Sequence, residues 1–156
     1  MMAKLLLSLH VLAAVIAVGP VTVAGSMFPA SVRRAAAAGP DAAALAPVRL
    51  LHRICRVYAL VGIAVPVFGF ATASTMGVLT DAWLLVSIGL TAIAAGVLAL
   101  LVLPGQQALL DRLDGGAAEV ERRTTARLAM LTGVFNLLWA VVTVLMIVRP
   151  GSSTGA

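Results

Sequence analysis

Two histidines are the residues of this chain best suited to bind a metal or a cofactor. His10 lies inside an apolar run that begins at Leu5, and His52 lies among arginines ahead of a second apolar run. Imidazole is a common metal ligand in proteins. The chain has a single cysteine, Cys55, so neither an intrachain disulfide nor a cysteine metal cluster is expected.

The two histidines are predicted to lie too far apart in depth to bind one iron. At a rise of 1.5 Å per residue, His10 lies about 8 Å in from one edge of the membrane, and His52 precedes the next span on the other side. Two nitrogens on one iron must be about 4 Å apart, whereas this pair is separated by roughly 20 Å. We therefore predict no metal site and no shared haem. A haem held by His10 alone stays open, beside a His10 that is hydrogen-bonded inside the bundle or has another polar role.

The composition places these residues in a membrane protein. Of 156 residues, 62% are hydrophobic and 11% are charged, and the mean hydropathy is +1.09. Charged residues make up about a quarter of a typical soluble domain. Four stretches reach the roughly 20 apolar residues that a span needs. We predict one all-α domain, residues 1–156, forming a bundle of four transmembrane helices over residues 5–28, 57–79, 82–103 and 128–148.

The first apolar run is predicted to be a retained helix and not a cleaved secretion signal. A small-residue segment, Val23-Ala24-Gly25, loosely resembles a cleavage site. However, the apolar core of a signal is about 7 to 15 residues long, whereas this run continues through Phe28.

The basic residues predict the orientation of the bundle. Nine of the 11 lie in two segments, residues 29–56 and 104–127. Under the positive-inside rule these are cytoplasmic loops, so both termini face outward. Because these charges flank spans, we expect no nucleic acid despite a pI near 11.1. Abundant arginine and alanine suggest a GC-rich bacterial genome and therefore the bacterial inner membrane.

Four basic positions between the first two spans share one helix face, which is predicted to meet lipid. Their spacing of three, one and three residues places them together. Such a face would contact anionic head groups of the cytoplasmic leaflet. A specific lipid or protein partner is the alternative. The positions are Arg49, His52, Arg53 and Arg56.

Small residues in the second span and one amide in the fourth are predicted to pack helices together. Four-residue spacing of small side chains lets another helix approach closely, within the bundle or in a homo-oligomer. Asn136 falls near the bilayer centre and should face the interior, where it fixes helix contacts or lines a polar path. Gly69, Ala73 and Gly77 have this spacing, and Gly62 precedes them in the same span.

The chain lacks the motifs of several functional classes. No carboxylate lies inside the four spans, although proton-coupled transporters usually need one there. Phosphate loops, zinc motifs, nucleophile elbows and paired redox cysteines are also absent from the sequence. We predict no catalytic residues and a non-enzymatic protein.

The phrases "LLLSLHVLAAVIAVGPV" and "LLHRICRVYALVGIAVPVFGF", with four spans in fewer than 160 residues, resemble a family of small bacterial integral membrane proteins of unknown function. That family is distantly similar to copper-resistance D-type membrane proteins and to the haem-associated bacterial protoporphyrinogen oxidase of the membrane. The resemblance covers chiefly residues 5–70. It implies a haem or copper connection through His10, the position most like the early histidine of those relatives.

The sequence leaves three hypotheses about the function. The first is a non-enzymatic accessory or interaction subunit with no cofactor. Its helices would be held together by Asn136 and by the small residues of the second span, here called the small-residue seam. The second is a haem or metal protein of electron transfer or porphyrin metabolism that uses His10. The third is a small transporter with a polar path past His10, Thr132 and Asn136.

Overall fold

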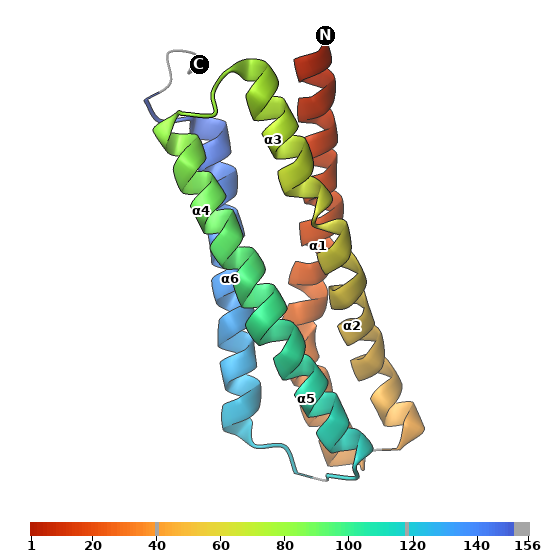
Figure 1. The fold of residues 1–156 in the computed structure, drawn as a ribbon. Coiled ribbons are helices and arrows are strands. Elements are labelled where there is room, and N and C mark those ends of the chain that lie inside the picture. The colour runs from red at the N-terminus through yellow and green to blue at the C-terminus, as the bar shows by residue number, and fades with distance from the viewer. Residues whose placement is uncertain (40, 118, 152–156) are drawn as a thin grey trace.

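The chain folds entirely into helices in the part that the structure describes. A computed structural model describes residues 1–39, 41–117 and 119–151. Figure 1 shows the helices side by side in one elongated bundle. In chain order they are α1 (Met2–Ala38), α2 (Ala42–Val61), α3 (Ala64–Met76), α4 (Ala82–Gly96), the π-helical turn η1 (Val97–Val102), α5 (Leu103–Asp114) and α6 (Arg122–Val148).

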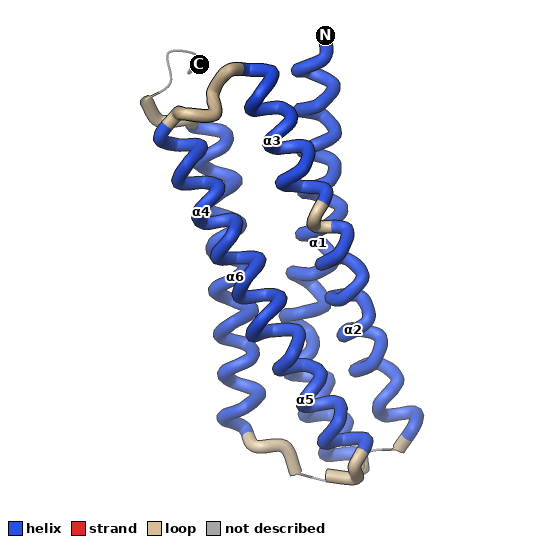
Figure 2. Tube along the Cα trace, in the orientation of Figure 1, coloured by secondary structure: helices blue, strands red, loops and turns tan. Residues whose placement is uncertain are grey.

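These helices form four candidate membrane spans, which confirms the predicted fold class. α1 is one span, α2 with α3 a second, α4 through α5 a third, and α6 the fourth. The N-terminus, the turn between α3 and α4, and the end of α6 lie together at one end of the bundle, here called the terminal end (Figure 1). The connections α1–α2 and α5–α6 lie at the opposite end, here called the distal end (Figure 2).

The helices extend beyond the predicted spans at the distal end. Residues 29–56 were expected as a loop, but α1 continues to Ala38 and α2 begins at Ala42. Runs of alanine strongly favour helix, which accounts for the extension on both sides of the connection. Asp41 caps α2, because its carboxylate accepts a hydrogen bond of 2.7 Å from the backbone N–H of Ala44.

The second and third spans each depart from regular α-helix about halfway along. Between α2 and α3 the backbone turns at Gly62 and Ile63. Pro66 has no N–H to donate to the carbonyl of Gly62, which instead accepts from Val65 N at 3.1 Å. In the third span η1 widens the helix, a feature often found at functional sites.

The packed core lies towards the distal end, and the helices separate towards the terminal end. The main buried cluster includes Phe28 and Val32 of α1, Val102 of η1, and Leu109 and Leu113 of α5. Towards the terminal end, α1 packs with α3, and α4 packs with α6. Among described residues, α3 has at most isolated contacts with α4 or α6. The two helix pairs therefore diverge, as Figure 1 shows for α3 and α4.

Candidate functional site

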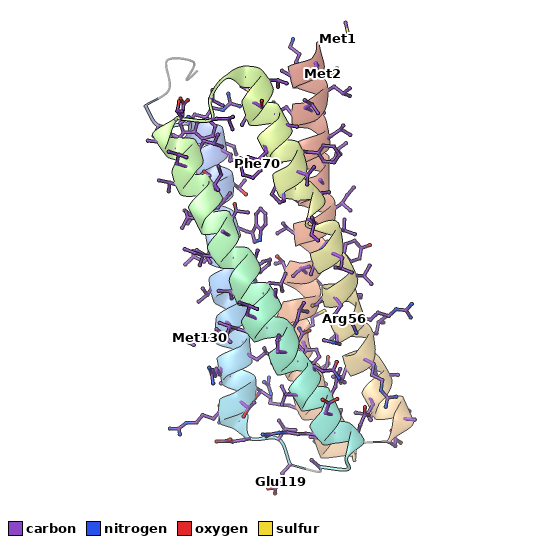
Figure 3. All side chains as sticks on the ribbon, viewed as in Figure 1. Met1, Met2, Arg56, Phe70, Glu119 and Met130 are labelled. Atoms are coloured by element: carbon purple, nitrogen blue, oxygen red, sulfur yellow. The ribbon has the colours of Figure 1, made fainter. Side chains whose placement is uncertain are left out.

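The divergence of the helix pairs leaves a large apolar cleft in the terminal half of the bundle. Its volume is about 1050 Å³, and α1, α3, α4 and α6 all contribute to its walls. Most lining side chains are apolar, and Phe70 of α3, labelled in Figure 3, is half exposed there. Ligand pockets in proteins are of this size and are mostly apolar with a few polar groups, which give a site its specificity.

His10 lies on the wall formed by α1 and α3, where the hydroxyl of Thr72 is already donated to the Phe68 carbonyl of its own helix. Its Nδ1 lies 2.8 Å from the carbonyl oxygen of Val65. The imidazole fits there because Gly69 has no side chain: a Cβ on Gly69 would lie only 3.0 Å from Cε1 and 3.2 Å from Nδ1 of His10. The glycine therefore allows the ring to lie directly against α3.

The Val65 hydrogen bond determines which nitrogen of His10 can bind a ligand. A backbone carbonyl only accepts hydrogen bonds, so Nδ1 must carry the proton that is donated. In neutral imidazole, Nε2 then keeps a free lone pair. Metal-binding histidines in proteins commonly have this arrangement, with the other ring N–H donated to a carbonyl or carboxylate.

Trp139 of α6 lies on the opposite wall, where its indole nitrogen is buried and not open to the cleft. Its ring lines the cleft and packs edge-to-face on Phe135, with ring centroids 6.3 Å apart. Its Nε1–H is buried and has no hydrogen-bond partner among the described residues. Trp139 lies ten residues before Arg149, and Gly69 lies seven before the end of α3, so both are roughly 10 to 15 Å below the terminal end. The indole N–H and His10 are therefore at similar depth.

Arg149 lies at the mouth of the cleft, at the end of α6. Its guanidinium carbon is 5.7 Å from the ring centroid of Trp83, and its Nε donates to the carbonyl of Met146 at 3.3 Å. Trp83 in turn donates from Nε1 to the Asp81 carboxylate at 3.0 Å. Among the described residues that line the cleft, Arg149 is the single one that is fully charged.

His52 is far from this cleft, and the structure corrects its predicted exposure. It was expected on the lipid-facing basic face, but it is only 6% exposed. Its Nδ1–H donates to Gln106 Oε1 at 2.9 Å, and Gln106 Nε2 donates to Cys55 Sγ at 3.5 Å. His52 belongs to the buried stripe of α2, whose helical spacing continues through Leu45, Val48, His52 and Cys55.

The three arginines of the predicted basic face are exposed on α2. Arg56 is labelled on this helix in Figure 3, and Arg53 is likewise exposed. Arg49 is also exposed and forms a salt bridge with Asp114 at the end of α5. An exposed pair of this kind contributes little to stability, so the arginines remain available to the surroundings.

The predicted small-residue seam is shorter in the structure than in the sequence. Gly69 contacts His10 of α1, and Ala73 is buried. Gly62 and Gly77 instead lie at helix ends. A Cβ on Gly62 would meet its own helix at the Ala59 carbonyl, and Gly77 ends α3 with a φ of 70° that favours glycine.

Asn136 pairs with α1. Its Nδ2 lies 3.4 Å from Ser26 Oγ, and its Oδ1 is buried without a partner among the described residues. The side chain does not line the cleft, and neither does Thr132, whose hydroxyl donates to the Leu128 carbonyl of its own helix at 3.0 Å. The structure therefore does not join His10, Thr132 and Asn136 in one cavity of the described chain.

Residues 4–150 match the family described as "Predicted integral membrane protein (DUF2269)". The chain belongs to this family of integral membrane proteins. Comparisons with curated proteins and with solved structures gave no match. The family description agrees with the four apolar helices of the structure and says nothing about an activity.

Several residues of the cleft were not anticipated from the sequence. Trp139 and Arg149 are ordinary for the end of a membrane helix, where aromatic and basic residues are frequent. Met76 and Met146 are far apart in the sequence, yet both line the cleft. Only the divergence of α3 from α4 and α6 brings these residues to one space, and no local sequence pattern encodes that divergence.

Proposed function

We propose that the protein is a non-enzymatic membrane subunit that binds a haem in the terminal half of the bundle, with His10 as the iron ligand. The observation that supports this most directly is the state of His10. Its Nδ1–H is taken by the Val65 carbonyl, and its ring lies in the wall of an apolar cleft of about 1050 Å³. Nε2 therefore has a free lone pair that can bind iron, in a site lined mostly by apolar side chains.

The residues of the cleft fit an iron porphyrin with one ligand from this chain. The macrocycle is apolar and flat, and the walls offer apolar side chains from four helices. Met76, the methionine of α3, lies roughly 10 Å beyond Gly69 along the helix and is too distant to bind the same iron as His10. His52 is 13 residues from Val65, roughly 20 Å along nearly continuous helix. Met146 of α6 also lines the cleft, but it lies three residues before Arg149, within roughly 5 Å of the terminal end and above the depth of His10.

Each wall of the cleft has a distinct role in this proposal. A bound iron porphyrin would supply one-electron redox chemistry. His10 binds and orients the group, and Gly69 permits the close approach of the imidazole to α3. The apolar side chains exclude water, which in haem proteins helps to set the redox potential. The resemblance of the phrases around His10 to haem-associated and copper-resistance D-type membrane proteins is consistent with this role.

The setting that we propose is the bacterial inner membrane, with the terminal end outside. The support is the distribution of basic residues, since the exposed arginines 33, 34, 49, 53 and 56 all lie in the distal halves of the first two spans, Met2–Ala38 and Ala42–Met76. The exposed arginines of α2 would then face anionic lipid of the cytoplasmic leaflet or a protein partner.

The ligand role of His10 can be tested by replacing it and restoring the imidazole from solution. Wild-type protein, purified in mild detergent and supplied with haem, should give a shifted Soret band and a reduced-minus-oxidised difference spectrum. We expect His10→Gly to lose this spectrum and free imidazole to restore it, because imidazole can occupy the vacated space as a ligand. His52→Gln is the matched control and should keep the wild-type spectrum, since His52 contacts Gln106 away from the cleft.

Two results would contradict the proposal. One is wild-type protein that takes up no haem under these conditions. The other is a His10→Gly spectrum that equals the wild-type spectrum without imidazole. Circular dichroism of each variant shows whether the helices remain folded, so loss of haem through unfolding is recognised separately.

A further inference from the structure

We propose that Arg149 binds the carboxylates of the porphyrin at the mouth of the cleft, and that this contact fixes the orientation of the group. This inference rests on the proposed function. Among the described residues of the lining, Arg149 is the single fully charged side chain, and the others are apolar or weakly polar. A porphyrin of the haem type combines an apolar macrocycle with two carboxylates on one edge, which matches this arrangement.

The structure holds the Arg149 guanidinium in place at the mouth. The end of α6 turns into the left-handed region at Arg149, where φ is 44°, and the backbone N–H donates to Leu145 at 2.9 Å. The side chain then lies 5.7 Å from the centroid of Trp83. A cation at this distance from a tryptophan ring is attracted to it, so α4 positions a residue of α6.

The guanidinium retains free donors in this position. Its Nε donates to the Met146 carbonyl, and its two terminal nitrogens have no hydrogen-bond partner among the described residues. Arginine presents donors in a planar fork that suits a carboxylate. Asp81, the residue before α4, accepts a hydrogen bond from Trp83 and is not part of the lining. Among the described residues no carboxylate pairs with this guanidinium, so we expect a carboxylate that enters the mouth to bind it.

The depths of His10 and Arg149 give the direction of the bound group. The partners of His10 on α3, Val65 and Gly69, lie roughly 10 to 16 Å below the end of that helix, while Arg149 is at the terminal end. The long arginine side chain and the flexible carboxyl side chains of a porphyrin can shorten this gap. With iron at His10, the carboxylates point to the terminal end. The reverse orientation would place two negative charges in the apolar packed core, where uncompensated charge is strongly disfavoured.

A comparison of haem with its dimethyl ester isolates this contact. The ester keeps the iron and macrocycle but removes both negative charges. We expect wild-type protein to bind haem about 10-fold more tightly than the ester, a difference of ~1.4 kcal/mol. Arg149→Gln should bind both about equally, and Arg149→Lys should keep part of the preference because it keeps the charge without the fork. Arg56→Gln, an exposed arginine outside the cleft, is the control and should keep the full preference.

Trp83 is a positioning residue in this proposal, and it gives a second readout. Trp83→Leu removes the ring beneath the guanidinium and should reduce the preference for haem over its ester. Trp83→Phe keeps a ring and should preserve more of it. Because the measured quantity is a ratio of two affinities for the same variant, a general loss of folded protein affects both ligands alike.

The outcomes separate this inference from the function on which it rests. Equal binding of haem and ester by wild-type protein, with the His10 spectrum intact, would overturn the role of Arg149 and leave the haem site standing. A preference that survives Arg149→Gln would do the same. Failure of wild-type protein to bind either porphyrin would overturn both proposals.

Discussion

The hydrogen bond between His10 and Val65 converts an ordinary membrane histidine into a candidate ligand. A histidine inside a helix bundle can donate a hydrogen bond to any nearby acceptor, so the residue type alone says little about its role. Here the acceptor is a backbone carbonyl, 2.8 Å from Nδ1, which fixes the proton on that nitrogen. The chemistry of the site therefore depends on Nε2 and on the position of the ring against Gly69.

Gly69→Ala tests the importance of this close packing. The new Cβ would lie 3.0 Å from His10 Cε1, so the ring must move by a few tenths of an ångström from its position in the hydrogen bond with Val65. We expect haem affinity to fall roughly 10-fold, equivalent to ~1.4 kcal/mol, with little change in helicity. Haem titration followed by absorbance measures the affinity. Gly89→Ala is the matched control, because a Cβ there has no neighbour within 4 Å. Equal affinities for the two variants would contradict the proposed contact.

At the residue scale, the sequence identified His10 but not its state. The carbonyl that orients it belongs to Val65, 55 residues away, and its side chain gives no sign of that contact. His52 was expected among exposed basic residues because arginines flank it on the same helix. The spacing of Leu45, Val48, His52 and Cys55 would have indicated a buried stripe, since these positions follow helical periodicity.

At the scale of elements, the second and third spans are each interrupted near the level where the closely packed core ends and the cleft begins. The turn at Gly62 and Ile63 lies 14 residues before the end of α3, and η1 begins 15 residues after the start of α4. At 1.5 Å per residue these are roughly 20 Å from the terminal end. The direction of each span can change at this level, which accounts for close packing on the distal side and divergence on the other.

Gln106 of α5 connects α5 to α2 on the distal side, and a substitution there tests how much this contact, here called the α2–α5 joint, stabilises the bundle. This side chain is fully buried and pairs with both His52 and Cys55 of α2. Gln106→Ala leaves His52 without its partner, and we expect the free energy of unfolding to fall by about 2 kcal/mol. Gln107→Ala, which removes an exposed contact with Asp111, should change it little. Denaturant titration in detergent, followed by circular dichroism, compares them, and equal stability losses would contradict the role of this joint.

The number and approximate position of the spans could be predicted from sequence, because apolar length alone determines them. The residues at which the helices begin and end could not be predicted in this way. Residues 29–47 mix proline, glycine and alanine without clear periodicity, so they were placed in a loop between spans, yet Pro29 lies inside α1. The cleft was also beyond prediction, since it depends on which helix pairs stay in contact along their length.

At the scale of the whole molecule, the two ends of the bundle differ in charge. The distal end carries most of the arginines on α1, α2, α5 and the start of α6. The terminal end carries few charges, among them Lys4, Asp81 and Arg149. This asymmetry favours an orientation with the distal end in the cytoplasm.

Reporter fusions test this orientation. Alkaline phosphatase, which is active only outside the cytoplasm, should be active when fused after α6, and a green fluorescent protein fused there by the general secretory route should be dark. A fusion in the α5–α6 connection should give the opposite pattern. A bright fluorescent fusion after α6, with inactive phosphatase, would contradict the orientation.

The haem content of the protein as isolated tests the central proposal most directly. Protein expressed in cells with ample haem and purified in mild detergent would be analysed by the pyridine haemochrome method and by protein quantification. We expect close to one haem per chain, and far less for His10→Ala purified in parallel. A featureless spectrum from well-folded wild-type protein, or equal haem in both proteins, would contradict a haem site at His10.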